Sequence, residues 1–108
     1  MNAEELSALL ETTGLPVTYR QWKKGSEPPP PYICYLFAYS GDFVADNQNY
    51  MPISNYQVEL YTRHKDPAAE ELVEQVLREN RLPYTKTEVY LDSEKMVQVV
   101  YLIRLIGG

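Results

Sequence analysis

A chain of 108 residues, of which 44% are hydrophobic and 23% charged, has the composition of one soluble globular domain. This composition argues against wholesale disorder and a collagen-like repeat, and a single cysteine argues against a disulfide scaffold. The net charge of −5, with Lys and Arg scattered along the chain, argues against sequence-specific nucleic-acid binding, which relies on a basic patch. We also expect no signal peptide and no membrane contact, because no apolar stretch approaches the roughly 20 residues of a membrane span.

The N-terminal segment predicts a short helix and then a strand. Asn2 is placed to cap the first helical turn, with Glu5 as the returning partner of a capping box. Three leucines fall on one helical face, and Gly14 is placed to end the helix. Residues 17–22 follow a proline and are expected to form the first strand.

A proline-rich loop at 23–31 leads into the most apolar run of the chain. Its four consecutive prolines favour a stiff polyproline II lead-in, with docking into an aromatic groove as the alternative interpretation. Residues 32–39, YICYLFAY, lack a helical amphipathic pattern and predict a central strand buried on both faces. Cys34 lies in this run, so we expect a buried, reduced thiol of a cytosolic protein.

The middle of the chain predicts a polar turn region followed by a long strand. Residues 40–49 are polar, with a short extended piece at 43–45. Residues 52–63 alternate in polarity, which indicates a strand with one buried and one wetter face. The apolar face consists of Tyr56, Val58 and Leu60, and the wetter face contains Gln57, Glu59 and Arg63.

The second helix has the clearest start signal in the chain. Asp66 is placed as its cap, and Pro67 occupies the first helical position, where a missing N–H costs nothing. The apolar stripe expected to pack on a sheet consists of Ala69, Leu72, Val73, Val76 and Leu77. The opposite face is expected to consist of Glu71, Glu74, Gln75 and Arg78.

The last third of the chain predicts an antiparallel hairpin. Residues 84–91 and 95–106 read as strands, and the turn between them is short. One face of the final strand is apolar and consists of Val97, Val99, Tyr101, Ile103 and Leu105. Its other face also contains apolar residues, so we expect a helix of the same chain or a neighbouring subunit to cover it.

The order of these elements indicates the fold class. Strands run together and the two helices are segregated from them, which is typical of an α+β protein. We therefore predict one α+β domain over residues 1–108, with an antiparallel-rich mixed sheet and two helices packed on it. No internal repeat and no linker divides the sequence.

Residue patterns for nucleophilic catalysis or metal binding are weak. His64, the only histidine, has cationic neighbours on both sides and is interpreted as an exposed residue at a strand end. One histidine and one cysteine thirty positions apart do not form a zinc site. The loop with Asp42 and Asp46 lacks the glycine and the distal glutamate of a calcium loop.

Patterns for acid–base catalysis and phosphate binding are equally weak. Glu88 and Glu94 flank the hairpin turn, but no apolar surroundings are evident that would shift the pKa of either carboxylate. The chain has no glycine-rich phosphate loop and no dinucleotide fingerprint. We therefore expect a protein that is not an enzyme and uses no cofactor or metal.

An interaction surface is the remaining functional prediction. The strand at 52–63 alternates tyrosines with charged residues, and tyrosine is favoured at interfaces. The polar loop before it has a length that is often functional, with an ordinary solvated loop as the alternative. Trp22 lies in a basic cluster and could stack on a base, although a solvated loop is the simpler interpretation. The predicted interface residues are Asp42, Asp46, Asn47, Tyr50, Gln57, Glu59, Tyr61 and Arg63.

Several blocks of the sequence resemble a family of small structural proteins of tailed bacteriophages and prophages. These blocks are LPVTYRQW, PPYICYLF, NYQVELYTRHKD with the following PAAEELVEQVLREN, and YTKTEVYLDSEKMVQVVYLIRL. Together they extend over about residues 5–106 and look like the tail terminator, or head–tail joining, class. The resemblance lies in strand and helix blocks and includes no catalytic signature.

The resemblance implies a compact α+β subunit that forms a ring, commonly hexameric, on the end of the tail tube. The implied partners are further copies of the chain, the tail tube protein and head–tail connector proteins. The implied location is the bacterial cytoplasm during assembly and then the tail or neck of the virion. The alternative function is a non-enzymatic bacterial binding module that uses the tyrosine-rich strand as its docking surface.

Overall fold

The computed structural model describes residues 1–41, 43–45 and 48–107 of the chain. The helices within these residues are α1 (Ala3–Glu11) and α2 (Pro67–Glu79). The strands are β1 (Val17–Tyr19), β2 (Tyr32–Ser40), β3 (Phe43–Ala45), β4 (Gln48–Met51), β5 (Ile53–Thr62), β6 (Tyr84–Leu91) and β7 (Met96–Ile106). Five strands form a sheet in the order β1-β2-β5-β7-β6, and β3 pairs with β4 in a separate hairpin.

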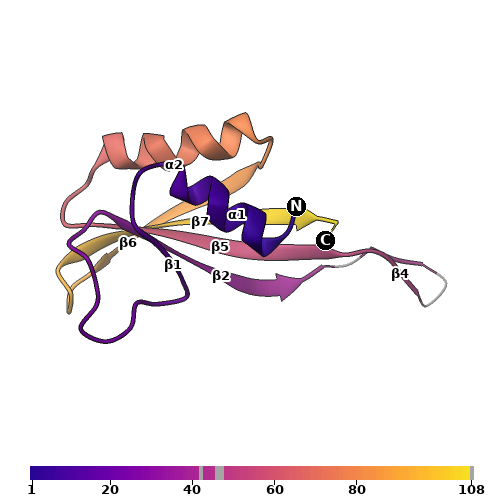
Figure 1. Ribbon diagram of the computed structural model, residues 1–108, viewed down its shortest axis with the longest axis horizontal. Coiled ribbons are helices and arrows are strands. Elements are labelled where there is room, and N and C mark those ends of the chain that lie inside the picture. The colour runs from indigo at the N-terminus through magenta and orange to yellow at the C-terminus, as the bar shows by residue number, and fades with distance from the viewer. Residues whose placement is uncertain (42, 46–47, 108) are drawn as a thin grey trace.

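The sheet confirms the predicted fold class. Strand β1 runs parallel to β2, whereas the β2–β5, β5–β7 and β6–β7 pairs are antiparallel. Both helices lie on the same side of this sheet (Figure 1). The protein is therefore an α+β fold with an antiparallel-rich mixed sheet and two helices packed on it.

The hydrophobic core lies between the two helices and one face of the sheet. Leu6 of α1 and Val73 of α2 have no solvent exposure and belong to one cluster with the sheet residues. The central sheet residues of this cluster are Ile33, Val58, Leu60, Val99, Tyr101 and Ile103. Burial of one such side chain stabilises the fold by roughly 1.5–3 kcal/mol. Because most buried hydrophobic residues belong to this cluster, it provides most of the hydrophobic stabilisation.

Local sequence signals fix the start of both helices as predicted. The Glu5 N–H donates to Asn2 Oδ1 at 2.8 Å and the Asn2 N–H donates to Glu5 Oε1 at 3.1 Å, which completes the capping box. In α2, the side chain of Asp66 accepts a hydrogen bond of 3.1 Å from the Ala69 N–H, and Pro67 follows at the first helical position.

The predicted buried stripe of α2 is partly wrong. Leu72 is 42% exposed, and Glu70, which was not in the stripe, is only 4% exposed. Glu74 was expected on the solvent side but is half-buried and accepts hydrogen bonds from the sheet. The helix is rotated toward β6 relative to the prediction, because lysines from outside the helix pair with Glu70 and Glu74.

Strand β2 is buried on both faces only in its first half. Residues 32–35 are buried, whereas Phe37 and Tyr39 are 40% and 55% exposed. The cause is its neighbour β1, which ends at Tyr19 opposite Tyr35 and leaves the rest of β2 without an outer strand. The predicted strand over 17–22 is shortened because Arg20 adopts a positive φ of 65°.

The hairpin of β3 and β4 extends the molecule beyond the sheet. It connects β2 to β5 and lies at one end of the long axis (Figure 1), and the molecule measures 49 × 28 × 22 Å. The short extended piece predicted at 43–45 is strand β3. The long strand predicted at 52–63 is β5, which pairs with β7 along its whole length.

Candidate functional site

The face of the sheet opposite the helices is the candidate interaction surface. Cross-strand register places one row of Cys34, Glu59 and Val100 beside a second row of Leu36, Gln57 and Leu102. Cys34 and Glu59 are buried, and the other four residues are half-buried. These six residues, together with Tyr61 and Gln98, make up the helix-free face.

A loop closes one end of the helix-free face. The ring of Trp22 meets the ring of Tyr32 edge to face, with centroids 5.8 Å apart. Its indole Nε1 is buried and has no hydrogen-bond partner among the described residues. Trp22 therefore packs against the sheet, which leaves little of its ring for the base stacking considered from the sequence.

A small polar cluster occupies the middle of the helix-free face. The Gln57 side-chain amide donates to Glu59 Oε2 at 2.7 Å, and the Tyr61 hydroxyl donates to Glu59 Oε1 at 2.9 Å. The Gln98 amide in turn donates to the Tyr61 hydroxyl at 2.9 Å. Each oxygen of the carboxylate thus has one neutral donor, which offsets part of the cost of removing the charge from water.

Glu59 was predicted on the wetter, outward side of the long strand but is buried within the helix-free face. It is 8% exposed, because Gln57 and Tyr61 lie on either side of it and Cys34 and Val100 are its cross-strand neighbours. None of the ion pairs formed by the described residues includes Glu59. The carboxylate is therefore held by neutral hydrogen-bond donors and has no cationic partner within the described part of the chain.

Burial and the Glu59 charge together suppress ionisation of two neighbouring groups. Burial raises the pKa of the Tyr61 phenol above its usual 10.0, and the charge of Glu59 raises it further. Burial, with a smaller contribution from Glu59, raises the pKa of the Cys34 thiol to about 12. Tyr61 therefore remains a hydrogen-bond donor, and Cys34 is a protonated thiol with little nucleophilic character at neutral pH.

The structure brings together three of the eight predicted interface residues. Gln57, Glu59 and Tyr61 form the polar cluster, whereas Arg63 follows the end of β5 and is exposed. Tyr50 falls in β4 of the hairpin. The remaining three, Asp42, Asp46 and Asn47, lie outside the described residues.

The other ionisable residues considered from the sequence do not meet at one place. His64 is exposed, and its backbone carbonyl accepts a hydrogen bond of 2.7 Å from the Thr62 hydroxyl. Glu88 pairs with Lys65 at 2.6 Å, whereas Glu94 accepts a hydrogen bond from the adjacent Ser93. Glu88 and Glu94 thus have separate partners and do not form a carboxylate pair.

Sequence reasoning missed an ion-pair network that joins α2 to β6 and β7. Lys86 Nζ lies 2.8 Å from Glu70 Oε1 and 2.7 Å from Glu74 Oε2. Lys65 Nζ lies 2.9 Å from Glu70 Oε2, and the Tyr101 hydroxyl donates to Glu74 Oε2 at 2.7 Å. The four-residue spacing of the two glutamates was the available signal, since it places both on one side of a helix.

This network lowers the pKa of both glutamates. Burial alone would raise the pKa of Glu70, but the hydrogen bonds from Lys86 and Lys65 outweigh it and bring it below the ordinary value of 4.5. For Glu74 burial is likewise opposed, by hydrogen bonds from Lys86 and Tyr101. Both carboxylates are therefore ionised at neutral pH and hold α2 on the sheet.

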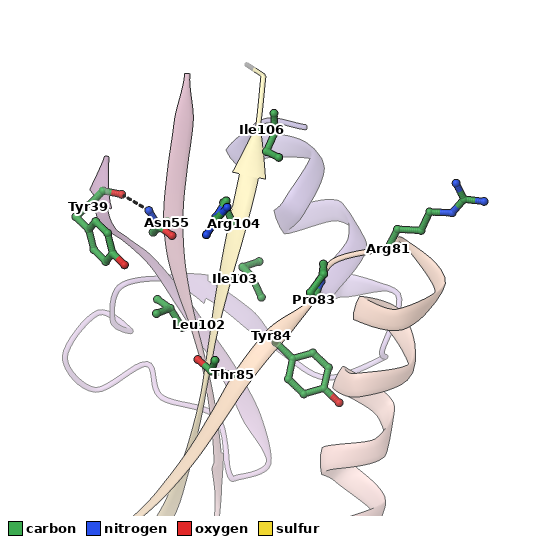
Figure 2. A pocket seen from close by; sticks show the side chains of 10 residues that line it. All are labelled: Tyr39, Asn55, Arg81, Pro83, Tyr84, Thr85, Leu102, Ile103, Arg104 and Ile106. Carbon is green, nitrogen blue, oxygen red and sulfur yellow. Dashed lines mark hydrogen bonds between the residues drawn. The ribbon is translucent and has the colours of Figure 1, made fainter. Parts of the chain in front are cut away.

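A shallow groove of about 400 Å³ lies near the end of the sheet where β6 begins. Figure 2 shows its lining, which includes Asn55, Leu102 and Tyr84, and the hydrogen bond from the Asn55 amide to the Tyr39 carbonyl. Its two charged lining residues are Arg81 and Arg104, and the Arg81 side chain extends away from the other lining residues. Among the described residues that line the groove, none is a carboxylate or a histidine that would act as a general base.

The described residues contain neither a metal site nor a membrane-spanning helix. Among residues 1–41, 43–45 and 48–107, no three His, Cys, Asp or Glu side chains are grouped to hold a metal ion. Neither described helix has the length and apolar character needed to cross a membrane. No protein-family model matches the chain, and no curated protein matches it.

Proposed function

We propose that this chain is a structural subunit of a tailed bacteriophage or prophage virion, of the tail terminator or head–tail joining class. In this role, copies of the chain form a ring, as a hexamer, on the end of the tail tube and stop its growth. The ring then offers a docking face to the head–tail connector proteins. The subunit acts without catalysis or a cofactor, first in the bacterial cytoplasm and later in the tail or neck of the virion.

The observation that carries this proposal is the helix-free face. Both helices lie on the other side of the sheet, so Leu36, Val100 and Leu102 remain half-buried with no helix over them. Apolar side chains that gather on one sheet face and are left partly exposed are typical of a surface that another protein covers. Of the two covers expected from the sequence, a neighbouring subunit fits this arrangement better than a helix of the same chain.

The elongated shape also supports assembly. The β3–β4 hairpin extends from one end of a molecule that is 49 Å long, away from both helices (Figure 1). An element that extends in this way can contact a neighbour while the sheet contacts another. Repeated head-to-tail contacts of one kind close into a ring when the rotation between subunits allows it.

Negative-stain microscopy of the purified protein mixed with tail tubes tests the proposal. We expect the wild-type protein to cap tube ends as rings, and Leu102→Glu to lose this capping because it places a charge on the helix-free face. Leu72→Glu is the matched control, since Leu72 is exposed on α2, and should cap normally. Tubes that stay uncapped by wild-type protein at every ratio would contradict the proposal.

The neighbouring genes provide an independent test. Genes for a major tail protein and a tape-measure protein beside this one would support the virion role. Metabolic or signalling genes on both sides would instead favour the bacterial binding module that uses the tyrosine-rich strand.

A further inference from the structure

Strand β6 forms an open edge of the sheet. It is the last strand in the order β1-β2-β5-β7-β6, and it pairs with β7 over all eight residues without a shift in register. Residues 85–90 are exposed, and Val89 and Tyr90 are 47% and 55% exposed. A regular, exposed edge strand presents unpaired N–H and C=O groups to which another strand can bind.

Several of the usual protections of a sheet edge are lacking at β6. The strand contains no proline and no bulge, and its two charged residues are both held on the side of the helices. Lys86 reaches Glu70 and Glu74 of α2, and Glu88 reaches Lys65. The opposite edge, β1, is protected by its length, because it has only three residues.

We propose that β6 pairs antiparallel with β6 of a second copy of this chain, with Thr87 of both copies at the two-fold axis. The two sheets then join into one, and the helices of both copies lie on the same side. The pairs formed in this register are Tyr84 with Tyr90, Thr85 with Val89, Lys86 with Glu88, and Thr87 with Thr87.

The charges on β6 select this register. With the axis at Thr87, Lys86 of each copy lies opposite Glu88 of the other, so two favourable charge pairs form. Moving the axis by one residue to Lys86 places the two Lys86 side chains opposite each other. Moving it by one residue to Glu88 places the two Glu88 side chains opposite each other. Like charges directly opposite destabilise a strand pair, so both alternatives are disfavoured.

The other pairs in this register are also compatible. Tyr84 and Tyr90 form two aromatic pairs on the side of the helices, and Thr85 and Val89 form two β-branched pairs on the opposite side. An interface in which each copy uses the same surface is isologous, and such two-fold dimers are the commonest protein oligomers. This inference does not rest on the virion role, because it concerns the free protein.

Disulfide trapping tests the pairing directly. Residues directly opposite in an antiparallel pair have Cα atoms about 4.5–5.5 Å apart, which is within the range that a disulfide spans. We therefore expect Thr87→Cys to form a disulfide-linked dimer under mild oxidation. Thr85→Cys is the matched control on the same strand and side, and alone it should not form one, because Thr85 lies opposite Val89. A mixture of Thr85→Cys and Val89→Cys should form mixed dimers.

The wild-type protein provides the background for this experiment. Its only cysteine, Cys34, is 3% exposed and should not cross-link. Light scattering on the wild-type protein should detect a dimer whose fraction rises with concentration. A wild-type protein that stays monomeric at every concentration, with Thr87→Cys linking no faster than Thr85→Cys, would overturn the pairing.

A charge reversal separates this register from other modes of dimerisation. Glu88→Lys places a lysine opposite Lys86 at two symmetric positions and should weaken the dimer roughly ten-fold. Glu88→Gln removes the same ion pair with Lys65 without adding a positive charge, so its effect should be smaller. Equal effects of the two substitutions would contradict the register. Neither outcome depends on tail tubes, so failure here is distinct from failure of tube capping.

Discussion

The two faces of the five-stranded sheet are built from the same strands but differ in what their side chains contact. On the helix-covered face, residues such as Leu60 and Ile103 are almost fully buried by α1, α2 and one another. On the helix-free face, a carboxylate, a phenol and two amides bond to each other among half-buried apolar side chains. The first face provides stability for the chain alone, whereas the second is the face that we propose contacts another molecule.

The largest expected effect compares the same substitution on the two faces. Leu60→Ala should lower the free energy of unfolding by about 2–5 kcal/mol, because it leaves a cavity under the helices. Leu102→Ala, on the half-buried helix-free face, should cost about 1 kcal/mol or less. Urea unfolding of both variants measures the difference. Equal losses would mean that the two faces are equally packed in the free protein.

A second, smaller effect concerns the polar cluster. Glu59→Ala should lower the free energy of unfolding by about 1–3 kcal/mol, because Gln57 and Tyr61 lose the acceptor for their hydrogen bonds. Tyr61→Phe removes one donor to Glu59 and the acceptor of the Gln98 amide but leaves Gln57 bonded to the carboxylate, so it should cost only about 0.5–1.5 kcal/mol. Urea unfolding again provides the measurement. A Glu59→Ala variant as stable as wild type would show that the cluster contributes nothing to folding.

The smallest expected effect is a dependence of stability on pH. The pKa values of Glu70 and Glu74 in the folded protein lie below the ordinary 4.5. The contribution of the two ionised carboxylates to the free energy of unfolding is therefore fully present above pH 4.5. It is lost as the pH falls through their folded values, so the free energy of unfolding should fall in this acidic range. Lys86→Met removes the shared cation and should flatten this part of a thermal-unfolding profile against pH. A profile for Lys86→Met parallel to wild type would contradict the assignment.

Local signals in the sequence predicted the fold class and the helix caps. The caps at Asn2 and Asp66 depend on residues three positions away, so they can be predicted without any tertiary information. Alternating polarity predicted the faces of β5 and β7 because a strand has a period of two residues. These predictions required only neighbours within the same segment.

Predictions failed where distant residues decide the outcome. Leu72 is exposed and Glu74 half-buried because Lys65 and Lys86, from outside the helix, pair with the glutamates of α2. The burial of Glu59 follows from Val100 and other neighbours on adjacent strands, whose positions the sequence alone does not supply. The pairing that we propose for β6 likewise depends on the position of β6 at the edge of the sheet, which the sequence alone does not supply.

The buried thiol of Cys34 can report local opening of the native structure. With its exposure at 3% and its pKa raised to about 12, the group is closed to alkylating reagents in the native state. Labelling at this position therefore requires the structure around Cys34, including the loop that carries Trp22, to open, and the rate of labelling in excess reagent reports how often that opening occurs. The labelling rate of one native side chain thus measures how often this end of the sheet opens, with and without bound neighbours, in an otherwise unmodified chain.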